Sequence, residues 1–377
     1  MNKFLDIAIS GVRNLAPYIP GKPIEELERE YHITHAVKLA SNENPYGPSP
    51  KVIQKLTDFI SNPTELARYP DGSGYLLKEK ISQHLPVSSN QITLGNGSND
   101  VLDIITRCFA GVGDEVIFSQ YAFAIYPIST QAVGATAVIT EADNWGHNLN
   151  AMIEAISVKT KLIFIANPNN PTGTCLSANQ LHQFLKQIPE RIIVVIDEAY
   201  MEYAAHNHSP WKKIYQPAHQ WLNEFDNLIV TRTFSKAYGL ASLRIGYSLS
   251  CADIADLLNR VRQPFNNNSL ALEAATIALD DQDYINQIAE KNWLQMKFIE
   301  DELNNLGINY IPSAGNFICI DVSSIKKSST TMDIYDKLLL KGLITRPVAN
   351  YNMRDHLRVT IGENVENQRL INFFKSI

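Results

Sequence analysis

The chain has 377 residues, enough to bury two domain-sized cores, and 39 acidic against 33 basic side chains give it a formal net charge of −6. This balance gives no support for a nucleic-acid or anionic-membrane partner, and no apolar stretch is long enough to span a bilayer. The four cysteines are scattered without metal-type or redox-type spacing, and the apolar run near Phe4 is too short for a signal peptide, so we expect a cytoplasmic protein.

Short apolar runs alternate with helical patterns along the first two thirds of the chain. We expect seven strands, at Gln91–Leu94, Glu115–Phe118, Thr136–Ile139, Leu162–Ile165, Ile192–Ile196, Leu228–Thr231 and Ile245–Leu249. Helical stretches such as 100–110 and 177–187 fall between several of them. This alternation predicts an α/β fold with a mostly parallel sheet and helices on both faces.

The pattern changes after Pro264–Ser269, where long helices follow as far as about Leu306. Short strands are expected beyond them, at Phe317–Asp321 and Leu357–Ile361. We therefore predict a large domain over 36–265, a smaller α/β domain over 266–377, and an N-terminal segment, 1–35, that packs on the smaller domain. The acidic run Asp280–Asp283 is more typical of a solvated helix end than of a cation site, and the loop Lys326–Thr331 is expected to be exposed.

The segment Gln91–Asp100 combines a strand, a glycine turn and a helix start. Backbone N–H groups of Gly97 and Ser98 at that helix N-terminus would face an anion, which the helix macrodipole favours. A plain connection capped by Ser98 or Asn99 is an equally good interpretation. The turn does not match the dinucleotide-binding fingerprint, because Asp100 stands where the third glycine would be.

Two further segments end in polar side chains at a position where open parallel sheets bind ligands. In Lys161–Gly173, prolines on both sides hold the amide of Asn170 in a fixed place. The apolar strand within Arg191–Tyr200 ends at Asp197. An aspartate at a strand end is also common as a cap or turn residue, so this signal alone is weak.

The segment Thr231–Gly246 is the most informative part of the chain. It places Lys236 in a small, hydroxyl-rich loop after a buried strand, with Arg244 two helical turns further on. Burial and a nearby cation both disfavour the ammonium form, and a neutral amine forms a Schiff base with an aldehyde cofactor. Thr233, Ser235 and Arg244 would then supply donors to a phosphate.

Such a cofactor gives Asp197 and its neighbours a chemical role. Next to a pyridine nitrogen, Asp197 would keep the ring protonated, and a protonated ring accepts electrons. Tyr200 and Asn170 could donate hydrogen bonds to the phenolic oxygen of the same ring. The ordered set of Asn170, Asp197, Tyr200, Lys236 and Arg244 is hard to obtain by chance.

With these residues the chain resembles the fold-type-I, pyridoxal-phosphate-dependent aminotransferases, and within them the histidinol-phosphate aminotransferase branch. The resemblance covers nearly the whole chain and includes Leu15–Lys22, Ser41–Pro50, Arg68–Gly72, Asn169–Gly173, Asp197–Tyr200, Ser235–Lys236 and His356–Gly362. The cofactor motifs are specific to the superfamily, whereas the first three segments and the last indicate the branch.

The resemblance assigns further residues to the cofactor. It implies that Gly97 and Ser98 grip the phosphate and that Phe123, in Tyr121–Tyr126, stacks on the pyridine ring, although aromatics there could also be core. Tyr69 is similar to a tyrosine that reaches the cofactor phosphate of the neighbouring subunit. We therefore expect a homodimer.

The substrate residues also follow from the resemblance. Arg358 and Arg346 correspond to positions that bind the anionic end of the substrate, where a guanidinium suits both carboxylate and phosphate, although both could be solvated surface residues. Tyr18 and Asn44 are expected in the substrate pocket. The implied reaction moves an amino group between L-histidinol phosphate and 2-oxoglutarate, giving imidazole-acetol phosphate and glutamate, with Lys236 as general base.

Three alternatives remain open at this point. An aromatic or broad-specificity aminotransferase would use the same scaffold, and a phosphothreonine-type decarboxylase would use the same cofactor chemistry. A non-catalytic regulator with this fold is disfavoured, because Lys236 and Asp197 are retained and no DNA-binding segment is appended.

Overall fold

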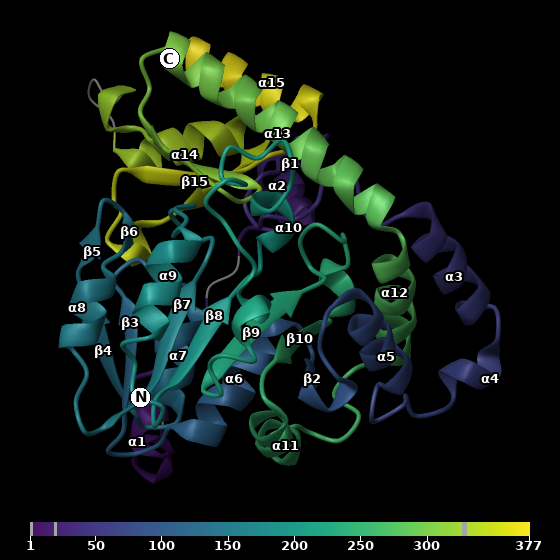
Figure 1. Cartoon of the computed structure of the whole chain (residues 1–377). Coiled ribbons are helices and arrows are strands. Elements are labelled where there is room, and N and C mark those ends of the chain that lie inside the picture. Colours follow the sequence, from purple (N-terminus) through teal and green to yellow (C-terminus); the bar gives the residue numbers. More distant parts are fainter. Residues whose placement is uncertain (1–2, 19–20, 326–329) are drawn as a thin grey trace.

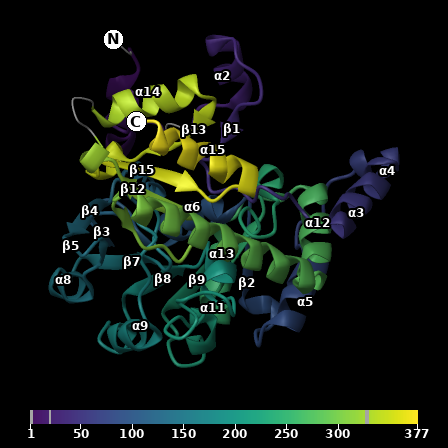
Figure 2. The ribbon, with the colours of Figure 1, turned by 90° about the horizontal axis from the view of Figure 1, so that it is seen from above.

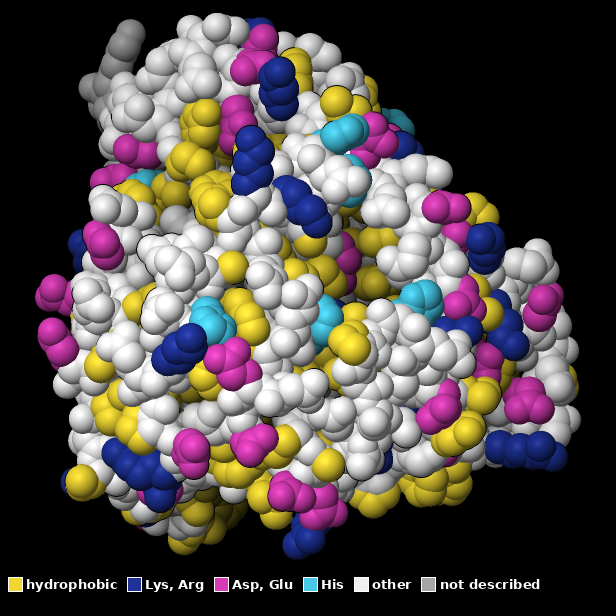
Figure 3. Space-filling view, viewed as in Figure 1, with side chains coloured by type: hydrophobic (Ala, Val, Ile, Leu, Met, Phe, Trp, Pro, Cys, Tyr) yellow, Lys and Arg dark blue, Asp and Glu magenta, His cyan; other side chains and the backbone are white. Residues whose placement is uncertain are grey.

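A computed structural model describes residues 3–18, 21–325 and 330–377 (Figure 1). Part of the loop Lys326–Thr331 and two residues of the Leu15–Lys22 motif lie outside the described residues. Within the described ranges no helix has both the length and the apolar character that a membrane crossing requires. On the face seen in Figure 3, side chains of both charges are interspersed.

The larger body is built on a seven-stranded sheet with the order β2-β10-β9-β8-β7-β3-β4. The strands are β2 (Ile92–Gly95), β3 (Glu115–Ser119), β4 (Thr136–Thr140), β7 (Thr160–Ala166), β8 (Ile193–Asp197), β9 (Leu228–Thr233) and β10 (Gly246–Leu249). All neighbours pair in parallel except β10, which runs antiparallel to both β2 and β9. The predicted α/β class and mostly parallel sheet are confirmed, with strand ends within about two residues of those expected.

Helices cover both faces of this sheet. The helices of the larger body are α3 (Pro50–Ile60), α4 (Pro63–Leu66), α5 (Tyr75–His84), α6 (Ser98–Phe109), α7 (Ile125–Ala132), α8 (Leu149–Glu154), α9 (Ala178–Leu185), α10 (Met201–Ala204), α11 (Ala252–Val261) and α12 (Ser269–Asp280), of which α3 packs on α12 and α4 packs on α3 rather than on the sheet. Along β7, Leu162 and Phe164 face the core formed with α6 and α11, whereas Ile163 and Ile165 face the core formed with α9 and α12. Burial on both faces explains why this strand is a continuous apolar run.

The smaller body lies above the sheet in Figure 1 and toward the viewer in Figure 2. It has a four-stranded antiparallel sheet with the order β11-β12-β15-β14. Its elements are α13 (Gln282–Asn305), β11 (Tyr310–Ile311), β12 (Phe317–Asp321), α14 (Thr331–Leu340), β13 (Leu343–Ile344), β14 (Arg346–Pro347), β15 (His356–Thr360) and α15 (Asn364–Lys375). A core of its own joins α13, α14 and α15 to this sheet.

The expected boundary at 265/266 does not coincide with the packing. Helix α12 packs against α3 and α5, and the first part of α13, as far as Ala289, contacts α10 and contributes to the same core of the larger body. The change from one core to the other therefore falls inside α13. The sequence pattern missed it because one helix serves both bodies. Asp280 and Asp281, in the acidic run between these helices, form ion pairs with Lys80 and Lys51.

The N-terminal segment divides between the two bodies. Helix α2 (Ile24–Tyr31) packs against α14, and β1 (Val37–Lys38) pairs in parallel with β13. Helix α1 (Ser10–Arg13) instead lies against α7 of the larger body, where the Cα of Gly11 is so close to the carbonyl of Gln131 that a Cβ would lie 2.0 Å from it. Only part of the segment 1–35 thus packs as expected, and the domain limits stay a prediction.

Candidate active site

A cavity of about 180 Å³ opens at the carboxyl edge of the large sheet. Strands β7, β8 and β9 end at Ala166, Asp197 and Thr233, and all three residues line it. The smaller body contributes Arg346 and Arg358 from β14 and β15. The cavity brings together these predicted site residues: Tyr18, Ser98, Phe123, Asn170, Asp197, Tyr200, Thr233, Ser235, Lys236, Arg244, Arg346 and Arg358.

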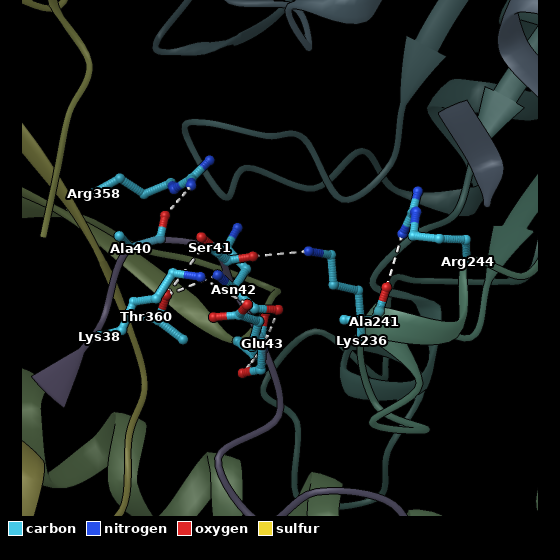
Figure 4. Close-up of polar contacts among 11 residues, drawn as sticks. Lys38, Ala40, Ser41, Asn42, Glu43, Lys236, Ala241, Arg244, Arg358 and Thr360 are labelled. Carbon is cyan, nitrogen blue, oxygen red and sulfur yellow. Dashed lines mark hydrogen bonds and ion pairs between the residues drawn. The ribbon is translucent and has the colours of Figure 1, made fainter. Parts of the chain in front are cut away.

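Lys236 lies in the loop after β9, which ends at Thr233, and its amine donates a hydrogen bond to the carbonyl oxygen of Ser41 at 3.0 Å (Figure 4). Burial, together with the guanidinium groups of Arg358 and Arg244, lowers the pKa of Lys236 to about 7. A large share of the amine is therefore neutral near pH 7. This is the protonation state that attacks an aldehyde.

Asp197 is buried at the end of β8, where two hydroxyl groups fix its carboxylate. The Tyr126 hydroxyl donates to Oδ2 at 3.0 Å, and the Thr231 hydroxyl donates to Oδ1 at 3.1 Å. Burial raises the pKa of Asp197 to about 6, against the opposing effect of these hydrogen bonds. The acid is thus mainly ionised at neutral pH and suited to hold a cationic ring nitrogen.

A second buried charge lies on the other side of the same strands. Glu198 accepts two hydrogen bonds from Arg232, at 3.0 and 2.8 Å, and both side chains are almost fully buried. The other carboxylate oxygen accepts from the Tyr215 hydroxyl and the Ala218 backbone N–H. The pair ties the residue after β8 to β9, and so supports the edge from which Asp197 projects.

Asn170 and Arg358 meet across the cavity. The Arg358 guanidinium donates from Nη1 to Asn170 Oδ1 and from Nη2 to the Ala40 carbonyl, both at 2.6 Å. Because its oxygen is engaged, the Asn170 side chain presents its NH2 group as a donor. Strand β15 is buried on both faces, so Arg358 lies inside the protein rather than on a solvated strand.

The end of the cavity that is expected to receive the phosphate is formed by the start of α6 and the loop before β10. Gly97 caps α6 at φ 86°, and a Cβ on it would lie only 2.3 Å from Arg244 Nη2. Arg244 donates from Nη1 to Ser235 Oγ at 3.3 Å. The sequence spacing implied a helical backbone at Arg244. The structure instead has a left-handed backbone there, at φ 56°, after the short 3-10 turn η4 (Ala241–Leu243). The left-handed residue lets the chain turn back into the antiparallel strand β10.

The model of the aminotransferase class I and II family matches residues 34–374 of the chain. The chain belongs to this family. Histidinol-phosphate aminotransferase 2 of Pseudomonas fluorescens (strain Pf0-1) is 49% identical over 376 residues, which cover 99% of this chain and 98% of that protein. Histidinol-phosphate aminotransferase 1 of Idiomarina loihiensis is 50% identical over 373 residues, which cover 99% and 98%.

Solved structures show the same architecture. The histidinol-phosphate aminotransferase of Sinorhizobium meliloti in complex with pyridoxal 5′-phosphate matches with a TM-score of 0.86 and 28% identity, over 98% of both chains. Aspartate aminotransferase of Thermus thermophilus with maleate matches with a TM-score of 0.81 at 18% identity over 97% of this chain and 98% of that one, which shows the fold alone. The predicted class, a fold-type-I pyridoxal-phosphate-dependent aminotransferase, is confirmed.

The residues of this aminotransferase fit pyridoxal phosphate. An amine with a lowered pKa, Lys236, and a buried carboxylate, Asp197, line one cavity. The glycine at position 97 leaves the space that a Cβ would take from the Arg244 guanidinium, so backbone N–H groups and this cation can face one phosphate. When bound, the cofactor supplies an electron sink that side chains lack.

Two predicted residues lie elsewhere. Tyr69 is 82% exposed, stacks on Phe265 with ring centroids 4.8 Å apart, and lines a separate hollow rather than this cavity. Asn44 uses its NH2 group on the carbonyls of Gly47 and Ala237, both at 3.0 Å, and lines a different hollow. Its role in substrate binding stays a prediction that the geometry does not favour.

Sequence reasoning missed several residues at the cavity or next to it, among them Ser41, Asn42, Tyr126 and Thr231. Ser41 and Asn42 contact Lys236 and Tyr200. Tyr126 lies in the aromatic segment from which only Phe123 was chosen. The one signal that could have found Thr231 is its place in the register, opposite Asp197 on the neighbouring parallel strand.

Proposed function

We propose that this aminotransferase acts on L-histidinol phosphate and 2-oxoglutarate, releasing imidazole-acetol phosphate and L-glutamate in histidine biosynthesis. The substrate assignment rests on sequence identities of 49% and 50%, over almost the full length, with proteins named histidinol-phosphate aminotransferases. The cavity is compatible with it, because two arginines accompany the amine in one site. The free thiols of the described cysteines support work in the reducing cytoplasm.

In this proposal Lys236 performs the proton transfer. Its amine would hold the aldehyde of the bound cofactor. Once released by the incoming amino group, the Lys236 amine would accept the proton from the substrate α-carbon, a positioned transfer that typically contributes about 10²–10⁴-fold to the rate. Asp197 would keep the ring nitrogen protonated, and Phe123 would pack on the ring. Tyr200 and Asn170 would donate to the phenolic oxygen, while Ser98, Thr233, Ser235 and Arg244 would hold the phosphate.

The arginines accept the two substrates in turn. A guanidinium presents a planar pair of donors that fits the carboxylate of glutamate and the phosphate of histidinol phosphate equally well. Arg358 is held in place by Asn170 and Ala40. Arg346 lies over the ring of Tyr18 at 5.8 Å, and this contact supports a role for both in the substrate pocket.

We further propose that the active unit is a homodimer. Tyr69, Leu76 and Phe265 form an exposed apolar patch, here called the α5 patch, at 82%, 64% and 46% exposure. Tyr69 stacks on Phe265, and Tyr69 and Leu76 line one hollow next to α4 and α5. Helices α3 and α4 project at the right edge of Figure 1, and α5 lies further in, beside α12. In a dimer the patch would be covered, and Tyr69 could reach the partner's cofactor.

The visible spectrum of the cofactor-loaded protein tests the substrate. L-Histidinol phosphate is added without a keto acid, and 2-oxoglutarate is added afterwards. Loss of the cofactor band at low histidinol phosphate, with recovery on 2-oxoglutarate, is the expected result. A band that ignores histidinol phosphate but disappears with phenylalanine or tyrosine would move the assignment to an aromatic or broad-specificity aminotransferase.

A further inference from the structure

Asn42 is a buried residue in the segment before α3. The two residues before it, Ala40 and Ser41, contact Arg358 and Lys236. Asn42 itself is 1% exposed and has a left-handed backbone at φ 54°, a conformation that asparagine tolerates better than most residues. Its backbone N–H donates to Thr360 Oγ1 at 2.9 Å, and its carbonyl accepts from Asn316 Nδ2 at 3.1 Å. Fully bonded backbone groups hold its side chain in one place.

The amide of Asn42 is oriented by two hydroxyl groups. The Thr360 hydroxyl donates to Oδ1 at 3.3 Å, and Nδ2 donates to the Tyr200 hydroxyl oxygen at 2.8 Å. Because the amide nitrogen only donates, Tyr200 acts here as an acceptor and keeps its own proton for another partner. No residue in the described part of the chain accepts that proton, and Tyr200 lines the cavity.

The segment around Asn42 is also held by Arg358 and Lys236. Figure 4 shows the carbonyl of Ala40 turned to Arg358 and the carbonyl of Ser41 turned to Lys236, on either side of the Asn42 side chain. The groups that meet substrate and cofactor therefore fix the position from which Asn42 reaches Tyr200.

We infer that Asn42 is a positioning residue that directs the Tyr200 hydroxyl proton into the cavity, toward the phenolic oxygen of the bound cofactor. This inference deepens the proposed function and rests on the contact between Tyr200 and the cofactor. The hydrogen bond from Asn42 also affects the acidity of the Tyr200 hydroxyl. Burial raises the pKa of Tyr200 to about 12, whereas the Arg358 charge and the Asn42 hydrogen bond act in the opposite direction and make it a better donor.

A donor on the phenolic oxygen has a spectroscopic consequence. It stabilises negative charge on that oxygen and weakens the attraction of the oxygen for the neighbouring proton on the Lys236 nitrogen. The visible absorption band of the bound cofactor changes when the Lys236 nitrogen loses this proton. The midpoint pH of that change should therefore be lower when Tyr200 donates. Since a hydrogen bond to a charged group corresponds to about one to two pKa units, its loss should raise this midpoint by about one pH unit.

The test compares cofactor-loaded N42D, N42G and Y200F with the wild type, each titrated by visible absorption. In N42D a carboxylate of nearly the same shape can only accept, so it draws the Tyr200 proton away from the cavity. N42G removes the side chain and keeps the left-handed backbone. We expect midpoints raised by about one pH unit in N42D and Y200F, and by less in N42G.

The double variants N42D/Y200F and N42G/Y200F separate an effect through Tyr200 from all others. A carboxylate at position 42 raises the midpoint by its charge in either background. The inference therefore requires that N42D raise the midpoint pH more when Tyr200 is present than in the Y200F background. It also requires that N42G leave the midpoint of Y200F unchanged. Equal shifts in both backgrounds, or wild-type midpoints in N42D and N42G, would overturn it while the Tyr200 contact stands. An unshifted Y200F would overturn that contact and the inference together.

Discussion

Arg358 and Asn170, 188 residues apart in the chain, are joined by a hydrogen bond of 2.6 Å between Nη1 and Oδ1. The bond connects the smaller body to the carboxyl edge of the large sheet. It holds the guanidinium that would receive the substrate carboxylate, and it leaves the NH2 group of Asn170 to donate to the cofactor. In the proposed function, the two ends of this one polar contact would recognise the substrate and the cofactor.

The variant Arg358→Lys tests this contact. A lysine cannot donate to Asn170, to Ala40 and to a carboxylate in the same planar arrangement. We expect kcat/KM for glutamate to fall about 10–100-fold, mostly through KM, as for the loss of a hydrogen bond to a charged group. Arg107→Lys, at a half-exposed ion pair on α6, is the matched control and should retain normal kinetics. An unchanged KM in Arg358→Lys would contradict the assigned role.

The pKa of Lys236 predicts the pH dependence of cofactor uptake by the apoprotein. Its folded-state pKa is lowered to about 7, so the fraction of the reactive neutral amine rises with pH. Deprotonation is nearly complete above pH 8. We expect the rate of covalent cofactor binding, followed by absorption, to rise up to about pH 7 and then to level off. An ordinary lysine would keep accelerating toward pH 10 or so, and such a profile would refute the burial argument.

Replacing the same residue tests the base. Lys236→Ala lacks the amine, so the covalent cofactor band and turnover should both be lost, with the proton transfer alone worth about 10²–10⁴-fold. Steady-state assays of the cofactor-loaded variant check this. Turnover that persists in Lys236→Ala would exclude it as the general base.

Gly97→Ala should weaken cofactor binding. The new Cβ would lie 2.3 Å from Arg244 Nη2, so the guanidinium must leave the place where it meets the phosphate. Gly113→Ala provides the control, because Gly113 also has a positive φ, 94°, but no atom lies within 4 Å of its Cβ position. Equilibrium dialysis should give a higher Kd for Gly97→Ala alone. Equal affinities in the two variants would count against the phosphate site.

The buried pair of Glu198 and Arg232 predicts a large stability effect. Removing either partner leaves an uncompensated buried charge, so Glu198→Gln and Arg232→Met should each destabilise the protein by about 3–5 kcal/mol. The double variant should lose less than the sum of the two, because neither charge remains. Urea unfolding of the apoprotein measures this. Arg260→Met, at an exposed pair with Asp256, should change stability by less than about 1 kcal/mol.

The α5 patch predicts an effect on assembly. Leu76→Glu places a charge on the surface that a dimer would bury, so it should shift sedimentation toward a monomer and lower activity. Val158→Glu is a control at an 89% exposed apolar side chain outside the α5 patch. A wild-type protein that sediments as a fully active monomer at micromolar concentration would exclude the proposed homodimer.

The sequence predicted most of the large sheet because its buried strands are apolar on both faces and bounded by turns. It also identified the residues at the strand ends that line the cavity, Asp197 and Thr233 among them. It did not predict the backbone of Arg244, since a left-handed residue after a 3-10 turn has no signature in a small-residue loop.

Asn42 shows why the rest of the site could not be predicted. Its partners, Tyr200, Asn316 and Thr360, are each at least 158 positions away, so no local pattern indicates their contact. The motif around it contains a second asparagine, Asn44, and only the folded backbone shows that Asn44 binds neighbouring carbonyls instead. Pairing across such distances is a property of the tertiary structure.

The reversed direction of β10 has a consequence for assembly of the phosphate site. Gly246 lies between Gly95 of β2 and Thr233 of β9, so the loop that carries Arg244 reaches Gly97 only when β10 is inserted between those two strands. A chain that ended before residue 246 would still contain Lys236 and Asp197 but would lack the closed end of the cavity. Tight uptake of the cofactor is therefore a signal that the most distant strand pairing of the large sheet is complete.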